Sequence, residues 1–186
     1  MANPSLDGYG SLPEVFVFDI DYTLWPYHIE LSSSPFSTAK RSGKSHRRIG
    51  PKTKGVPDDE YAVIDGYGQE ISLFSDARHI LESIKKAGKR IAVASRTEEP
   101  GYARQCLELL NLTKLISYYE IYPGNKDTHL SRIAKSAKVD FSKMVFFDDE
   151  MRNIHTAKKL GVHAVYTDGG LTWDYMHMAM ENYNRA

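Results

Sequence analysis

The chain has 186 residues, of which 41% are hydrophobic and 26% are charged, as is typical of one soluble globular domain. Lys and Arg together number 24, as do Asp and Glu, so the net charge of zero gives no indication of nucleic acid or membrane as a partner. Cys106 is the only cysteine, which excludes an internal disulfide and a cysteine-based zinc site. We expect a cytoplasmic protein, because the first residues do not resemble a signal peptide and no apolar stretch approaches the length of a membrane span.

The first predicted strand is the apolar run from Val15 to Phe18, which stops at Asp19 and Asp21. A buried strand that ends at two carboxylates places both at the carboxyl edge of a sheet, where open α/β folds bind ligands. One carboxylate there could bind a divalent cation or attack an electrophile, and the other could transfer a proton. An isolated Asp-x-Asp pair is more often a solvated acidic turn, so the interpretation depends on the rest of the chain.

The segment that follows is strongly basic. Residues 32–57 contain no acid, are rich in Ser, Gly and Pro, and show no periodicity, so we interpret residues 32–60 as a flexible loop. Basic runs of this kind are often solvated insertions; the alternative is an arm beside an active site that attracts anionic substrates. The seven basic residues are Lys40, Arg41, Lys44, Arg47, Arg48, Lys52 and Lys54.

The remaining chain alternates regularly. Residues 61–64 and 69–73 flank Asp65-Gly66-Tyr67-Gly68 and predict a β-hairpin. Five helices are then expected. The first would be capped by Ser75, the second would begin at Pro100, and the third would extend to Ala137. The last two would span 151–160 and 171 to about 183. Strands are expected between these helices at 91–94, 118–122, 144–147 and 162–166. Repeated strand–helix units predict a parallel sheet with helices on both faces.

Polar residues follow four of these strands. Asp19 and Asp21 follow the first, Ser95 follows the strand at 91–94, Lys126 follows 118–122, and Asp148-Asp149 follows 144–147. Each could be a turn, a cap or a surface residue, but the carboxyl ends of parallel strands meet at one edge, so we expect them to converge. Carboxylates suit Mg²⁺, while a lysine and a hydroxyl can hold phosphoryl oxygens. The combination predicts phosphoryl transfer.

In this order, the motifs at residues 18–26, 94–97, 121–126 and 146–150 resemble those of the haloacid dehalogenase (HAD) superfamily of aspartate-based phosphatases. More narrowly, they are similar to the magnesium-dependent phosphatase family. The resemblance implies a Rossmann-like three-layer α/β sandwich with a parallel central sheet, a small β-hairpin flap and no large cap domain. The resemblance runs from about Glu14 to Asp168. The length predicts one domain spanning residues 1–186, which we expect to be a monomer.

The resemblance assigns roles to the first two motifs. Asp19 would be the nucleophile and a ligand of Mg²⁺. Asp21 would be the general acid and base, its carbonyl oxygen would also bind the metal, and Thr23 would orient it through a hydrogen bond. Ser95 and the backbone of Arg96 would hold the phosphoryl group.

The later motifs complete the expected site. Lys126 would bridge the phosphoryl group and the nucleophile. Asp149 is the expected direct metal ligand, with Asp148 supporting Lys126 or a metal-bound water and Asn153 assisting, although the sequence leaves the order of the adjacent acids open. His28 stands where relatives carry an aromatic residue, and we expect it to contact the substrate.

The sequence therefore predicts a Mg²⁺-dependent phosphomonoesterase that acts through an aspartyl-phosphate, on phosphotyrosine in proteins or on sugar or glycated-amine phosphates. A dehalogenase would need no acid at Asp21, whereas a phosphomutase remains open. The alternative from another class is a phospho-acceptor signalling or binding module without turnover. Receiver domains carry an aspartate after a middle strand, where this chain has Ser95.

Overall fold

The computed structural model describes residues 4–40 and 61–185. Its main sheet has five strands in the order β6-β5-β1-β7-β8, and every neighbouring pair is parallel. These strands are β1 (Val15–Phe18), β5 (Arg90–Ser95), β6 (Tyr118–Ile121), β7 (Met144–Asp148) and β8 (His163–Tyr166). The parallel sheet and its helices confirm the predicted α/β architecture.

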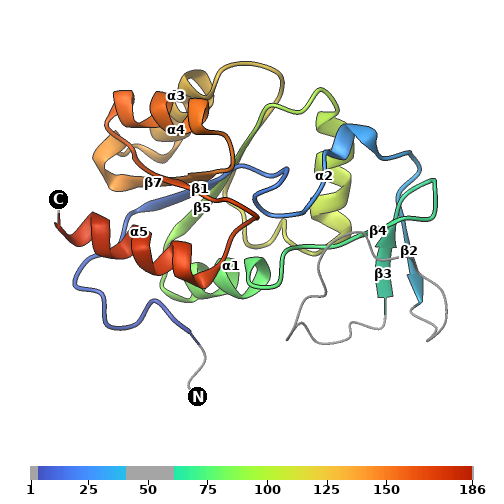
Figure 1. Cartoon of the computed structure of the whole chain (residues 1–186), viewed down its shortest axis with the longest axis horizontal. Coiled ribbons are helices and arrows are strands. Elements are labelled where there is room, and N and C mark those ends of the chain that lie inside the picture. Colours follow the sequence, from blue (N-terminus) through green and yellow to red (C-terminus); the bar gives the residue numbers. More distant parts are fainter. Residues whose placement is uncertain (1–3, 41–60, 186) are drawn as a thin grey trace.

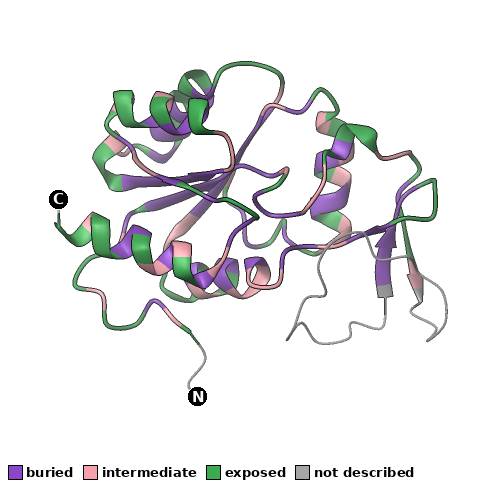
Figure 2. Ribbon diagram, in the orientation of Figure 1, coloured by how far each residue is buried: buried purple, intermediate pink, exposed green. Residues whose placement is uncertain are grey.

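Helices cover both faces of this sheet (Figure 1). They are α1 (Ala77–Lys86), α2 (Pro100–Leu109), α3 (Lys126–Ala137), α4 (Met151–Leu160) and α5 (Trp173–Arg185). Alternate residues of β1 separate the two layers: Phe16 and Phe18 belong to the core with α1, α2 and α5, whereas Val15 and Val17 pack with α3 and α4. The three central strands β5, β1 and β7 are therefore buried on both sides, which explains their largely apolar sequences (Figure 2).

A second, antiparallel sheet lies between β1 and α1 in the chain and forms a flap near α2 (Figure 1). Strands β3 (Tyr61–Ile64) and β4 (Glu70–Ile71) confirm the predicted hairpin. Its turn depends on Asp65, whose carboxylate accepts hydrogen bonds from the backbone N–H groups of Tyr67 and Gln69 at 2.9 and 2.8 Å.

The flap has one more strand than we expected, because β2 (Ser37–Lys40) pairs with β3. These four residues belong to the segment that we interpreted as loop. Ser37, Thr38 and Ala39 offer no apolar alternation, and an edge strand formed through backbone pairing gives little sequence signal. Residues 41–60, which carry the other six basic residues of the segment, lie outside the described residues.

Helix α1 begins one residue later than expected. Ser75 was the expected cap, but the N-cap is Asp76. The Asp76 carboxylate accepts a hydrogen bond from the backbone N–H of Trp173 at 3.1 Å. This bond joins the beginnings of α1 and α5. Two short 3₁₀ helices, η1 (Ile29–Leu31) and η2 (Phe141–Lys143), complete the elements. Within the described part of the chain, no helix combines the length and apolar character needed to cross a membrane.

Candidate active site

A cavity of about 300 Å³ opens at the carboxyl edge of the main sheet, where β1 lies between β5 and β7. This is the point at which the strand order reverses, and the predicted residues converge there. Eight of the ten residues expected at the site line the cavity: Asp19, Asp21, His28, Ser95, Arg96, Lys126, Asp149 and Asn153.

Lys126 lies at the first turn of α3, and only 1% of its side chain is exposed. Its Nζ lies 2.5 Å from Oδ1 of Asp19 and 3.2 Å from Oδ2 of Asp148, and it also donates to the carbonyl oxygen of Ala94. The ammonium group therefore donates to Asp19 and to Ala94 and forms an ion pair with Asp148. The pKa of Asp19 lies well above its usual range. Burial raises it most, attraction to Lys126 lowers it in part, and repulsion from Asp148 raises it further.

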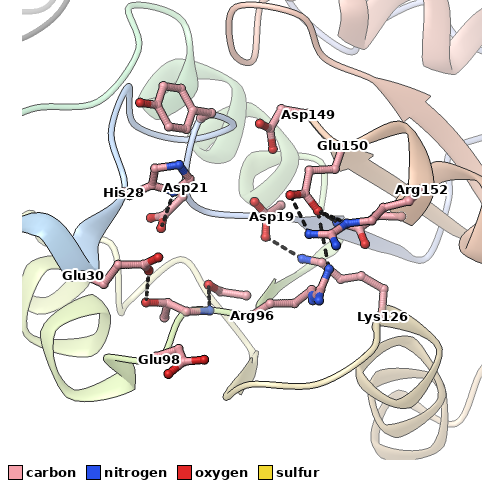
Figure 3. A pocket seen from close by; sticks show the side chains of 14 residues that line it. Asp19, Asp21, His28, Glu30, Arg96, Glu98, Lys126, Asp149, Glu150 and Arg152 are labelled. Carbon is pink, nitrogen blue, oxygen red and sulfur yellow. Dashed lines mark hydrogen bonds and ion pairs between the residues drawn. The ribbon is translucent and has the colours of Figure 1, made fainter.

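The adjacent acids after β7 have different surroundings. Asp148 is fully buried, and its carboxylate accepts hydrogen bonds from the backbone N–H of Glu150 at 2.8 Å and from Nδ2 of Asn153 at 3.0 Å. Asp149 faces the cavity (Figure 3), and in the described part of the chain no other residue donates a hydrogen bond to its carboxylate. Burial and repulsion from Asp148 raise the pKa of Asp149 to about 6. The geometry thus favours Asp149 for a direct ligand contact and Asp148 for holding Lys126.

Asp21 is oriented by the loop that follows it. Its Oδ1 accepts the indole N–H of Trp25 at 2.6 Å, and its Oδ2 accepts the backbone N–H of Ile29 at 3.2 Å. Burial raises the pKa of Asp21 to about 6, although both hydrogen bonds act in the opposite direction. The prediction that Thr23 orients Asp21 is wrong: the Thr23 hydroxyl is buried and lies 3.4 Å from that of Thr167.

The tight turn after β1 places Tyr22 beside His28 and Asp21. The carbonyl oxygen of Ile20 accepts three successive N–H groups, and Tyr22 adopts a left-handed conformation with φ of 53°. Tyr22 consequently lies at the cavity mouth, where its ring meets the edge of His28 with centroids 4.8 Å apart. His28 Nδ1 is 3.9 Å from Oδ2 of Asp21, so these side chains form one wall beside the acid.

Several charged lining residues were not predicted. Glu150 pairs with Arg152 at 2.8 Å and lies 3.5 Å from Arg96, while Glu30 accepts the hydroxyl proton of Thr97 at 2.9 Å. In Figure 3, Asp19 lies between these two groups. The full set that sequence reasoning missed is Tyr22, Glu30, Thr97, Glu98, Glu150 and Arg152. Tyr22, Thr97 and Glu150 lie within the recognised motifs, and Glu98 and Arg152 follow two of these motifs within two residues, which was the available signal. Glu30 had none, because only the fold of the loop returns it to the cavity.

The donor atoms fit a magnesium ion. Mg²⁺ prefers oxygen ligands, and the side chains of Asp19 and Asp149 with the carbonyl oxygen of Asp21 would supply them. Both side chains have raised pKa values, which means that the protein alone disfavours their ionised forms. A nearby divalent cation would restore these forms. Asp21, His28 and Glu30 also bring one ligand atom each within 4.8 Å of one another, but an imidazole suits Mg²⁺ less well.

Comparisons with known proteins identify the family. The sequence model of the family described as Acid Phosphatase matches residues 11–186. The human protein named Magnesium-dependent phosphatase 1 is 34% identical over 175 residues, covering 94% of this chain and 89% of the human protein. A HAD-like hydrolase superfamily protein of Schizosaccharomyces pombe is 34% identical over 160 residues, which cover 81% of this chain and 83% of the yeast protein.

Solved structures show the same fold. The crystal structure of a HAD-superfamily hydrolase from Ehrlichia chaffeensis aligns with a TM-score of 0.57 at 11% identity, covering 94% of this chain and 98% of that one. By its sequence the chain belongs to the acid phosphatase family, and it has the HAD fold.

Proposed function

We propose that this protein is a Mg²⁺-dependent phosphomonoesterase in which Asp19 forms an aspartyl-phosphate. The observation that carries the proposal is the 2.5 Å contact between Lys126 Nζ and the carboxylate of Asp19 at the bottom of an open cavity. The ammonium group favours the ionised, nucleophilic form of Asp19 against the effect of burial, which raises the pKa of this carboxyl group. The name of the human relative supports both the metal and the class of reaction.

The surrounding residues suit the two displacements. Asp19 would attack phosphorus and release the alcohol or phenol, while Lys126 and the Ser95 hydroxyl hold the phosphoryl oxygens, together with the backbone of Arg96. Asp21 would give its proton to the leaving oxygen and then take one from the water that cleaves the aspartyl-phosphate. When bound by Asp19, Asp149 and the carbonyl oxygen of Asp21, Mg²⁺ would supply positive charge beside the phosphate dianion.

Two features of the mouth bear on the substrate. Tyr22 and His28 offer aromatic surface to a leaving group, which supports phosphotyrosine in a protein as a substrate. Glu30 and Glu98 offer carboxylates to hydroxyl or amino groups, which supports sugar or glycated-amine phosphates. His28 is the proposed contact common to both, because it lies between Asp21 and Tyr22.

The test is hydrolysis of para-nitrophenyl phosphate by the wild type, Asp19→Asn and Asp21→Asn, with Mg²⁺ and with EDTA. We expect turnover only in the wild type with Mg²⁺, and we then expect His28→Ala to alter the ranking of phosphotyrosine peptides against sugar phosphates. A wild type that is inert but keeps a stable phosphoryl group on Asp19 would favour a phospho-acceptor module. Full activity in Asp19→Asn would refute the proposal.

A further inference from the structure

Behind the cavity, His129 on α3 connects three backbone segments. Its Nδ1 lies 2.7 Å from the carbonyl oxygen of Asn125, and its Nε2 lies 2.9 Å from that of Tyr122 and 3.1 Å from that of Ser95. The side chain is fully buried, and its ring stacks on Tyr122 with centroids 4.2 Å apart.

The three carbonyl groups belong to the parts of the backbone that carry phosphate-binding side chains. Ser95 ends β5 and carries one of them, and Asn125 is the N-cap of α3, directly before Lys126. Carbonyl oxygens only accept hydrogen bonds, so the donor in these contacts is the ring of His129. The ring therefore links three separate backbone groups, and a buried carbonyl group that lost this partner would be left unsatisfied, which costs free energy.

The charged groups around this ring do not offer another explanation. Arg132 lies 5.1 Å from the centre of the Tyr122 ring, on which His129 stacks. Lys126, three residues earlier on α3, turns its ammonium group to Asp19. Among residues 4–40 and 61–185, no carboxylate makes a hydrogen bond to His129. Carbonyl oxygens are therefore the groups that fix its orientation.

We propose that His129 is a positioning residue, whose ring contacts with the carbonyl groups of Asn125, Tyr122 and Ser95 hold Ser95 and Lys126 in register around Asp19. This inference rests on the proposed function. Without these ring donors, the connection from Tyr122 to Lys126 would loosen relative to β5. A misplacement of about 1 Å can cost about a hundredfold in rate, because the groups then fit the transition state poorly. Loss of the donors should therefore lower kcat more than it raises KM.

The test compares His129→Phe with His129→Gln and with Ile133→Ala. Phe keeps a ring that can stack on Tyr122 but removes the ring nitrogens, whereas the Gln amide can donate again near the position of Nε2. Ile133 is fully buried on the same helix, outside the cavity lining, and controls for lost stability. For His129→Phe we expect kcat to fall at least about tenfold and KM to change less than about threefold. Gln should recover part of kcat, and Ile133→Ala should keep kcat while lowering Tm.

A second readout does not depend on activity. In the folded wild type, NMR should find a ring N–H of His129 that exchanges slowly with solvent, because it is buried and hydrogen-bonded. A ring N–H that exchanges as fast as in the unfolded chain would overturn the inference, as would a kcat of His129→Phe within about twofold of the wild type, or an equal loss of kcat in Ile133→Ala. A wild type without Mg²⁺-dependent turnover would refute the proposed function itself, and the exchange rate would then test the hydrogen bond alone.

Discussion

Replacing Trp25 by Phe should raise the pKa of the Asp21 carboxyl group. The Trp25 indole N–H donates to Oδ1 of Asp21 at 2.6 Å, and this hydrogen bond stabilises the ionised carboxylate. Burial is the larger influence and already raises the pKa of Asp21 to about 6, while the bond from Trp25 is the strongest of the contacts that lower it. Its removal therefore shifts the pKa further upward.

The size of the shift follows from the strength of the bond. A hydrogen bond to a charged group contributes about 1.5–3 kcal/mol, and one pKa unit corresponds to about 1.4 kcal/mol. The side chain of Asp21 keeps 13% of its surface exposed, so water can replace part of the lost interaction. We therefore expect a rise of about one pKa unit, at the lower end of this range.

The pH dependence of kcat/KM measures this shift when the substrate is an alkyl phosphate, whose leaving group needs an acid. If Asp21 protonates the leaving group, activity is present below its pKa and is lost as pH rises through it, so the falling limb should move to higher pH in Trp25→Phe by about one unit. Bound Mg²⁺ lowers the pKa of Asp21 in both proteins, and the prediction therefore concerns the difference between them.

Tyr27→Phe is the matched control. The Tyr27 ring stacks near Trp25 with centroids 5.9 Å apart, and its hydroxyl donates to the carbonyl oxygen of Ser72, away from Asp21. This variant loses one hydrogen bond from the same loop and should keep the limb in place. An unchanged limb in Trp25→Phe, a limb displaced to lower pH, or an equal displacement in Tyr27→Phe would refute the reasoning.

Three further predictions concern stability. The pKa of Asp149 is about 6 in the folded protein and exceeds the unfolded value, so the stability that its protonated form provides is lost as pH rises through about 6. Asp149→Asn should therefore raise Tm in EDTA at pH 7.5, and it should remove most of the increase in Tm that Mg²⁺ gives the wild type. An undiminished increase in Tm would exclude Asp149 as a ligand. Asp148→Asn leaves the buried Lys126 with one carboxylate fewer and should lower the free energy of unfolding in urea by about 3 kcal/mol; no loss would contradict the contact. Gly170→Ala should cost about 3 kcal/mol in the same assay, because φ is +98° and the new Cβ would lie 2.4 Å from the Phe74 ring; a neutral result would show that the ring moves freely.

Much of the fold was predictable because buried strands and amphipathic helices leave periodic patterns. The run from Val15 to Phe18 and the helix at 151–160 were located from apolar spacing alone, and both are confirmed. Strand β2 was not, since Ser37 to Lys40 joins the flap through backbone pairing and its side chains carry no alternating pattern. Helix ends were also less certain: Ser75 is a good capping residue by type, but contacts with α5 engage Asp76 instead.

The site was predictable to the extent that residues at strand ends must converge. Asp19, Lys126 and Asp148 lie together as that rule requires. The partners of each side chain depend on loop conformation, which the sequence does not specify. For this reason Thr23 was assigned the contact that Trp25 makes with its indole N–H.

The most direct test of the central claim is to trap the phosphoryl group. Asp21→Asn should slow hydrolysis of an aspartyl-phosphate, because that step needs a base, while para-nitrophenol can leave without an acid. After acid quenching of this variant with Mg²⁺ and para-nitrophenyl phosphate, mass spectrometry should find one phosphoryl group on Asp19 and none when Asp19→Asn is added. A phosphoryl group on another residue, or rapid turnover by Asp19→Asn alone, would contradict the account.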